Sequence, residues 1–215
     1  MENIKGVIFD LDGTLFDSLW VWEEVDRRFL GKRGFEVPPD YSLAISAMSY
    51  RETAEYTIRR FGLNEQPEQL MREWLDLARE MYAREVKFKD GAIEFLHALK
   101  KRGLKLGIAT SSTADLYMPL LKNTDTYPLF STIMDTSGMR GKDYPDVYLA
   151  AAGAMGLQPS ECAVFEDVET GLKSAKQGGF VTVAIVDKHF SPQMKEIAHF
   201  TAATYSQLLE IVEAR

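Results

Sequence analysis

Two aspartates near the start of the chain stand two residues apart, directly after an apolar run. Asp10 and Asp12 follow the stretch Ile4–Phe9, which is typical of a buried parallel strand, and Gly13 then permits a sharp turn. Ligands of open parallel sheets bind beyond the carboxyl ends of the strands, so two carboxylates placed there could serve a reaction. The spacing D-x-D is also compatible with a plain acidic turn, and only the longer D-x-D-G-T favours a site.

A hydroxyl side chain and two more acids follow other apolar runs. Thr110 ends the run 104–109 and precedes Ser111, and the pair Glu166–Asp167 follows the run 162–165. Each group has an ordinary explanation by itself, because hydroxyls cap helices and acids are favoured at helix N-termini. Together they place hydrogen-bond donors and oxygen ligands at the ends of several strands. Phosphoryl transfer needs such groups, since its catalysis is mostly positioning and electrostatics.

These segments resemble, in order, the motifs of the haloacid dehalogenase-like phosphohydrolases. The matching segments are 10–15 (D-x-D-G-T-L), Thr110, 142–146 (K-D-Y-P-D) and 166–171 (E-D-x-x-x-G). The resemblance covers residues 4–180 and points to the subgroup of β-phosphoglucomutase-like and phosphoglycolate phosphatase-like proteins. The third motif departs from the usual K-P-x-P-D of the family. Asp143 replaces the first proline and leaves the loop without that rigid residue.

The resemblance implies a role for each matching residue. Asp10 would be the nucleophile that forms an aspartyl-phosphate, and Asp12 would be the general acid and base. Thr110 and its neighbour Ser111 would donate hydrogen bonds to the phosphoryl oxygens. Lys142 would neutralise the charge of Asp10 and of the phosphoryl group as a compact point charge. The ligands of the implied cofactor, Mg²⁺, would be Asp10, the backbone carbonyl of Asp12, Asp167 and, through a water, Glu166.

Hydrophobic periodicity and chain breakers predict the elements that position these groups. From Ser18 to about Lys87 the pattern is helical, with a first helix that carries Leu19 to Phe29. The further helices predicted in this part are 51–61 and 67–85. After Gly91 helices alternate with short apolar runs. The helices predicted there are 92–102, 145–155, 171–177 and 205–214, and the strands are 104–110, 132–136, 162–165 and 181–186.

Alternating strands and helices imply parallel pairing with right-handed crossovers. We therefore predict an α/β fold, a Rossmann-like doubly wound parallel sheet with an inserted α-helical cap. Residues 1–17 and 88–215 would form the catalytic core, and residues 18–87 the cap. The resemblance implies the strand order 5-4-1-2-3. Because the insertion follows the loop that carries the two aspartates, we expect it to act as a lid over the site.

Composition limits the binding partners and the cellular compartment that we expect for this chain. The net charge is -7 with acids and bases interspersed, which argues against a nucleic-acid partner. Cys162 is the single cysteine, so no internal disulfide can form and a reducing compartment is expected. The chain shows no secretory signal peptide and no apolar run near the ~20 residues of a membrane span. We expect a cytoplasmic monomer whose partner is a small phosphorylated metabolite, with no membrane or nucleic acid.

The predicted function is a Mg²⁺-dependent phosphatase that hydrolyses a sugar or organic phosphate through an aspartyl-phosphate. One alternative is a phosphosugar mutase of the β-phosphoglucomutase type, but Trp22 stands where that mutase has a histidine. The other alternative is a receiver-like module that binds phosphate without catalysis. Such a module would have little use for Asp12 or for an insertion over residues 18–87.

Three residues of the insertion are candidates for contact with the substrate. A segment around Tyr50 resembles the substrate loop of the family, and Tyr50, Arg51 or Trp22 could contact the leaving group. Arg51 could equally form an ordinary i,i+4 ion pair with Glu55 on a helix surface. The sequence leaves both interpretations of Arg51 open.

Overall fold

The structure is a computed structural model that describes residues 3–45, 48–188 and 190–213. The chain forms two compact units, each of which is described by itself. The core unit comprises Met1–Ser18 and Lys87–Arg215, and the helical unit comprises Leu19–Val86. No helix in these described ranges combines the length and the apolar character needed to cross a membrane.

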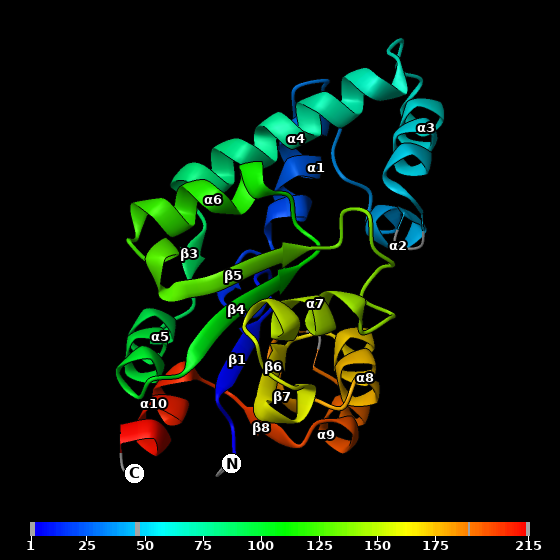
Figure 1. Cartoon of the computed structure of the whole chain (residues 1–215). Coiled ribbons are helices and arrows are strands. Elements are labelled where there is room, and N and C mark those ends of the chain that lie inside the picture. Colours follow the sequence, from blue (N-terminus) through cyan, green and yellow to red (C-terminus); the bar gives the residue numbers. More distant parts are fainter. Residues whose placement is uncertain (1–2, 46–47, 189, 214–215) are drawn as a thin grey trace. The chain divides into compact units, whose positions relative to one another are not determined.

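A parallel sheet of six strands forms the centre of the core unit, in the order β5-β4-β1-β6-β7-β8 (Figure 1). In that order the strands are Phe130–Asp135, Lys105–Thr110, Gly6–Phe9, Cys162–Glu166, Val181–Ile185 and Phe200–Ala202. If β1, β4, β5, β6 and β7 are numbered 1 to 5 in chain order, their order across the sheet is 5-4-1-2-3. This confirms the expected strand order. The edge strand β8 was not predicted, because two of its three residues are exposed and carry no apolar pattern.

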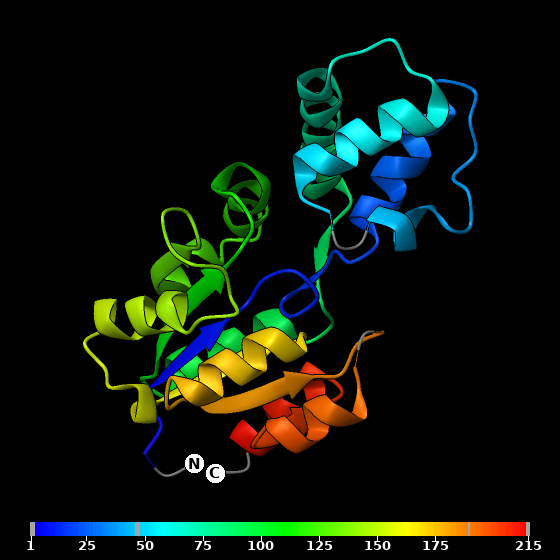
Figure 2. The same ribbon diagram turned by 90° about the vertical axis from the view of Figure 1, so that its right-hand side faces the viewer.

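The central strand β1 is apolar throughout because helices cover both faces of the sheet (Figure 2). Ile8 packs in one cluster with Ala151 of α7 (Asp146–Ala154) and Ala175 of α8 (Glu169–Gln177). The next residue, Phe9, faces the other side, where its ring centroid lies 6.3 Å from that of Phe95 in α5 (Ala92–Lys101). The remaining core helices are α6 (Ala114–Asn123), α9 (Pro192–Ile197) and α10 (Tyr205–Glu213), with 3-10 turns at Tyr127–Leu129 and Pro159–Glu161.

The helical unit contains α1 (Val21–Gly31), α2 (Tyr41–Ile45), α3 (Tyr50–Phe61) and α4 (Pro67–Arg84). Its buried centre includes Phe29 and Trp74, whose ring centroids lie 5.4 Å apart. Local signals explain the ends of α3. Ser49 forms a capping box with Glu52 at its start, and Gly62 ends it in the left-handed conformation (φ 62°). Within the helical unit only α2 was not predicted, since its five residues show no periodic pattern.

A short antiparallel pair closes the base of the insertion. Strands β2 (Phe16–Asp17) and β3 (Lys87–Phe88) pair through Phe16 with Phe88 and Asp17 with Lys87. The rings of Phe16 and Phe88 meet edge to face at 4.9 Å. Two-residue strands leave no recognisable pattern in a sequence. This pair was therefore not predicted, although its position agrees with an insertion directly after the first strand-loop.

Candidate active site

Three buried carboxylates converge at the carboxyl ends of the neighbouring strands β1 and β6. Asp10 directly follows β1, Glu166 ends β6, and Asp167 follows it; their exposed fractions are 6%, 0% and 1%. One oxygen from each of the three lies within 4.8 Å of the others. The backbone N–H of Asp10 donates to the carbonyl of Phe165 at 3.0 Å. The hydrogen bonds between β1 and β6 therefore hold the backbone of Asp10 in place. Three acids this close and this buried require positive charge nearby.

Lys142 supplies part of that charge from the loop between β5 and α7. Its Nζ donates to Oδ1 of Asp10 and, at 2.7 Å, to Oε1 of Glu166. Burial by itself lowers the pKa of Lys142, but the carboxylates of Asp10 and Glu166 outweigh this and raise the pKa above its ordinary value. Lys142 therefore stays charged and bridges two of the three acids.

The single positive charge of Lys142 does not neutralise the three carboxylates. Burial raises the pKa of Asp10 well above its ordinary value, and although Lys142 lowers it, Glu166 and Asp167 raise it further. Burial and then Glu166 raise the pKa of Asp167 to about 7. Moreover, Glu166 Oε2 and Asp167 Oδ2 are buried without a hydrogen-bond partner among the described residues. Buried orphan oxygens beside a third acid are the donor set that a divalent cation such as Mg²⁺ takes.

Three residues outside the predicted set hold the acids in place. Tyr148 of α7 donates its hydroxyl to Glu166 Oε1 at 2.6 Å, and Thr14 donates to Asp167 Oδ1 at 3.0 Å. At Gly171 on α8, a Cβ would lie only 2.6 Å from the carboxyl carbon of Glu166. Thr14 and Gly171 belong to the quoted motifs. The contact of Tyr148 with Glu166 could not be predicted, because its position in the sequence is that of an ordinary core residue of a helix.

Asp12 is held separately by two serine hydroxyls. Ser18 donates to Asp12 Oδ1 at 2.7 Å, and Ser112 donates to Asp12 Oδ2. Ser111, which the resemblance suggests as a donor to phosphoryl oxygens, is exposed. The hydroxyl that reaches Asp12 belongs to its neighbour Ser112. Thr110 is buried at the end of β4, and its Oγ1 accepts a hydrogen bond from the N–H of Ser112 at 3.0 Å. The hydroxyl of Thr110 thus stabilises the turn that places Ser112 beside Asp12.

Comparison with known proteins decides the family. The profile described as haloacid dehalogenase-like hydrolase matches residues 7–185, which is most of the chain. The chain belongs to the haloacid dehalogenase-like hydrolases. A relative from Bacillus subtilis (strain 168), the candidate phosphatase YhcW, is 30% identical over 190 residues, which cover 86% of this chain and 84% of that protein. The β-phosphoglucomutase of the same organism is 27% identical over 199 residues, covering 85% of this chain and 83% of the relative.

A solved structure shows the same fold for this hydrolase. A candidate β-phosphoglucomutase from Thermotoga maritima superimposes with a TM-score of 0.87 over 98% of this chain and 99% of that chain, at 22% identity. The resemblance drawn from the four motifs is therefore confirmed, and the chain is an enzyme of the hydrolase class. The family generally uses Mg²⁺, and the buried acidic cluster of this hydrolase fits such an ion.

The other candidate residues of the hydrolase lie in its helical unit. The rings of Trp22 and Tyr50 meet at 6.0 Å with exposed fractions of 44% and 38%, and the hydroxyl of Tyr50 donates to the carbonyl of Met71. Arg51 pairs with Glu68 at 2.8 Å and with Glu55 at 3.3 Å. The i,i+4 ion pair that the sequence left open is thus present. Trp22 and Tyr50 form an exposed aromatic pair at the starts of α1 and α3.

Asp26 lies one helical turn after Trp22 and is half-buried. Burial and then Glu23 raise its pKa to about 7. A carboxyl group whose pKa is raised by folding binds its proton more tightly in the folded chain, so it destabilises the fold as pH rises from about 4 through 7. We expect Asp26→Asn to be more stable than the parent by roughly 1–2 kcal/mol at pH 8 and nearly equal to it at pH 4.

Thermal unfolding at the two pH values measures this difference. Asp76→Asn on α4 is the matched control, since the side chain of Asp76 is 70% exposed, and its effect on stability should stay within about 0.5 kcal/mol. A gain for Asp26→Asn of the same size at both pH values would contradict the assignment.

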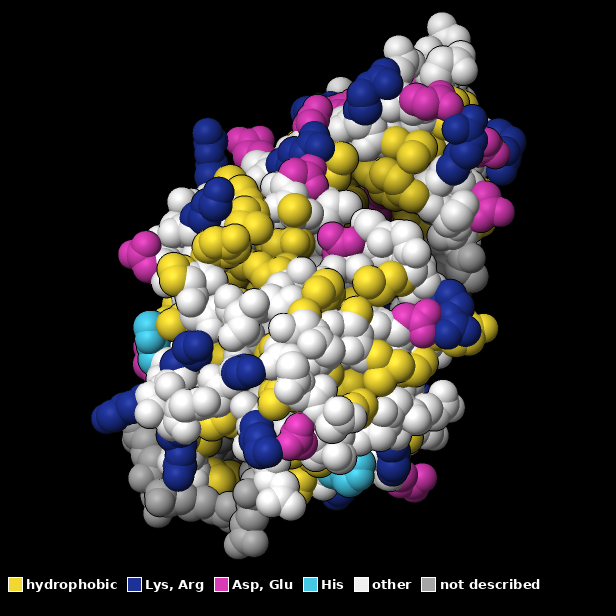
Figure 3. All heavy atoms as spheres, viewed as in Figure 1, with side chains coloured by type: hydrophobic (Ala, Val, Ile, Leu, Met, Phe, Trp, Pro, Cys, Tyr) yellow, Lys and Arg dark blue, Asp and Glu magenta, His cyan; other side chains and the backbone are white. Residues whose placement is uncertain are grey.

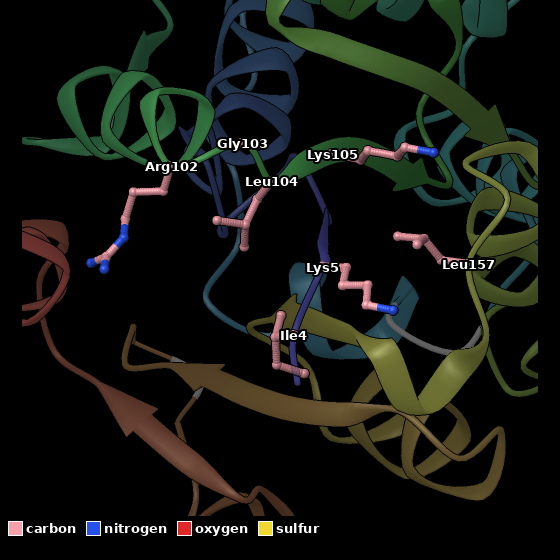
Figure 4. A pocket seen from close by; sticks show the side chains of 7 residues that line it. All are labelled: Ile4, Lys5, Arg102, Gly103, Leu104, Lys105 and Leu157. Carbon is pink, nitrogen blue, oxygen red and sulfur yellow. The ribbon is translucent and has the colours of Figure 1, made fainter. Parts of the chain in front are cut away.

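A pocket of about 410 Å³ lies at the opposite edge of the core sheet (Figure 4). It is lined by residues at the amino ends of β1 and β4, together with Arg102, Gly103 and Leu157. In Figure 4 the charged ends of Lys5 and Lys105 both point to the right, and that of Arg102 points to the lower left. Each already has a partner: Lys5 pairs with Glu161, and the other two donate to backbone carbonyls. The cluster of buried acids lies at the carboxyl ends of the strands and does not line this pocket.

Side chains on the surface carry no single sign of charge on the face shown in Figure 3. Basic and acidic groups are interspersed there with apolar patches. This agrees with the many exposed ion pairs of the helical unit, such as Arg28 with Glu85 at 3.0 Å and Lys32 with Glu73 at 3.1 Å. Such exposed pairs contribute little to stability individually.

Proposed function

We propose that this hydrolase is a Mg²⁺-dependent phosphatase that hydrolyses a small phosphorylated metabolite, a sugar or organic phosphate. The observation that carries the proposal is the buried cluster of Asp10, Glu166 and Asp167, in which Lys142 bridges the first two. Two carboxylate oxygens of this cluster have no hydrogen-bond partner in the described part of the chain. The names of two relatives, a candidate phosphatase and a mutase of a phosphorylated sugar, support the substrate class.

The metal ligands that we propose are Asp10, the backbone carbonyl of Asp12, Asp167 and, directly or through a water, Glu166. When bound, Mg²⁺ would neutralise charge on the acids and on the phosphoryl oxygens. Lys142 would add a fixed positive charge at Asp10, since its ammonium already contacts that carboxylate. Thr110 and the turn through Ser111 and Ser112 would donate to the phosphoryl oxygens.

The reaction that we propose has two steps. A carboxylate oxygen of Asp10 attacks phosphorus, the bond from phosphorus to the ester oxygen breaks, and Asp12 gives its proton to the departing alkoxide. Asp12 then takes a proton from water as the water oxygen attacks phosphorus. The bond to Asp10 breaks, orthophosphate leaves, and both aspartates return to their starting states. The hydroxyls of Ser18 and Ser112 suit this role, because they orient both oxygens of Asp12.

Residues 18–87 are proposed as the cap that selects the substrate. The exposed rings of Trp22 and Tyr50 would contact the leaving group, with Arg51 beside them. The absence of a histidine at position 22 supports hydrolysis over the mutase reaction, because the mutase has a histidine there.

The deciding experiment measures phosphate release from an aryl phosphate and from a panel of sugar phosphates. We expect Mg²⁺-dependent release that EDTA abolishes and that added Mg²⁺ restores. Conversion of β-glucose 1-phosphate to glucose 6-phosphate with little free phosphate would instead establish the mutase. Binding of phosphate without any turnover of either substrate would favour the receiver-like module and overturn the proposal.

A further inference from the structure

The side chain of Lys142 has to reach two acids from a loop that is mostly exposed. Residues 137–141 and 143–144 are all exposed, whereas Lys142 itself is only 11% exposed along its side chain. The loop also lacks the proline that usually follows this lysine in the family, because Asp143 stands there. A long side chain on an unsupported loop would lose part of its charge effect through motion. Something else must therefore hold the backbone of Lys142.

Helix α8 provides that support. The Oγ of Ser174 donates to the backbone carbonyl of Lys142 at 2.6 Å, and Ser174 is only 1% exposed. The same hydroxyl lies 3.3 Å from the carbonyl of Gly171, the ordinary partner of a serine within a helix. A hydroxyl has one proton to donate, and the shorter distance assigns it to Lys142.

The rest of the loop is tied down around this contact. The N–H of Tyr144 donates to the carbonyl of Gly141 at 3.0 Å and closes a turn with Lys142 and Asp143 at its centre. Arg140 forms two hydrogen bonds of 2.7 Å with Asp146, and its guanidinium lies 4.0 Å from the ring centroid of Tyr144. These bonds stiffen the loop internally, but the bond from Ser174 attaches the residue that carries the ammonium to a helix of the core.

Helix α8 also contacts Glu166, one of the two acids that Lys142 bridges. Gly171 lies against the carboxylate of Glu166, three residues before Ser174 on α8. One rigid element therefore sets the position of Glu166 and of the Lys142 backbone together. We propose that Ser174 is a positioning residue that holds Lys142 for charge stabilisation at Asp10, in place of the missing proline. This inference rests on the proposed function.

The test compares Ser174→Ala with the parent in aryl phosphate hydrolysis and in binding of orthovanadate, measured by calorimetry in Mg²⁺ buffer. We expect kcat to fall about tenfold with KM changed less than twofold, because Lys142 acts on the transition state. Orthovanadate affinity should fall by a similar factor. Thr126→Val is the matched control, since it removes another buried hydroxyl that donates to a backbone carbonyl, Leu121 O at 3.3 Å. It should leave both quantities unchanged.

A double variant separates positioning from a general structural role. In a Lys142→Ala background, Ser174→Ala should weaken orthovanadate binding by less than a further twofold, because the group it positions is gone. Equal losses in both backgrounds, or no loss in the parent, would overturn the proposal. Should Ser174→Ala fail to fold, Ser174→Cys replaces it, since it keeps the volume and weakens the donor. A parent chain that hydrolyses no ester refutes the proposed function, whereas the binding measurements still decide the role of Ser174.

Discussion

Replacing Asp10 with asparagine is expected to lower phosphate release from every phosphoester by roughly 10,000-fold, the largest effect of any single change in this chain. The amide cannot attack phosphorus, and it also removes the carboxylate that the ammonium of Lys142 contacts. Steady-state kinetics with an aryl phosphate in Mg²⁺ buffer measures the loss. Acid quenching of the parent during turnover should trap phosphate on the protein, and the variant should trap none.

The control for this prediction is Asp125→Asn. Asp125 is exposed and lies in the left-handed region (φ 54°), a conformation that asparagine tolerates well. This variant should keep the activity of the parent. Circular dichroism should show that Asp10→Asn folds, because asparagine has nearly the volume of aspartate. A folded Asp10→Asn variant with activity within tenfold of the parent would refute Asp10 as the nucleophile.

Asp12→Asn is expected to give the second largest loss, and one that depends on the leaving group. A sugar alkoxide leaves poorly without a proton, so hydrolysis of a sugar phosphate should fall roughly 1,000-fold. An activated aryl oxide leaves without protonation, so the first step with an aryl phosphate should survive. The second step needs a base for water and should be slow. Rapid-mixing kinetics should therefore show a burst of about one equivalent of the aryl alcohol, followed by slow turnover.

The burst distinguishes a proton-transfer role from disruption of the site. If Asp12→Asn slowed the first step with both leaving groups by the same factor, Asp12 would be a structural or metal-binding residue only. Ser18→Ala provides a milder comparison, because it removes one of the hydroxyls that orient the Asp12 carboxylate and leaves the carboxylate itself. It should show a smaller loss with the same preference for the activated ester.

Much of the fold was predictable because its strands are apolar runs that end in chemically distinct residues. The run before Asp10 and the run before Glu166 became the adjacent strands β1 and β6, so their acids meet as parallel pairing requires. The short strands β2, β3 and β8 were missed because two or three residues carry no periodicity. Pairing of such segments is decided by the surrounding structure and not by local pattern.

The candidate site was predictable at the level of its charged residues and not at the level of what supports them. Motif spacing indicated Lys142, but nothing in the sequence near Tyr148 or Ser174 indicates that these side chains reach Glu166 and the Lys142 backbone. The contact between Ser112 and Asp12 could not be predicted for the same reason. After a strand ends, the direction of each side chain depends on the geometry of the turn, and here the second serine faces Asp12.

The narrow β2–β3 ladder brings together the two points at which the chain leaves and re-enters the core unit. Since the chain departs at Asp17 and returns at Lys87, its paired neighbour, any segment whose two ends lie side by side could be spliced in without disturbing the strands on either side. The parallel sheet and the acids at its edge would stay the same while the guest segment changed. Exchange of such modules offers a simple evolutionary route by which one set of acids could come to serve many different esters.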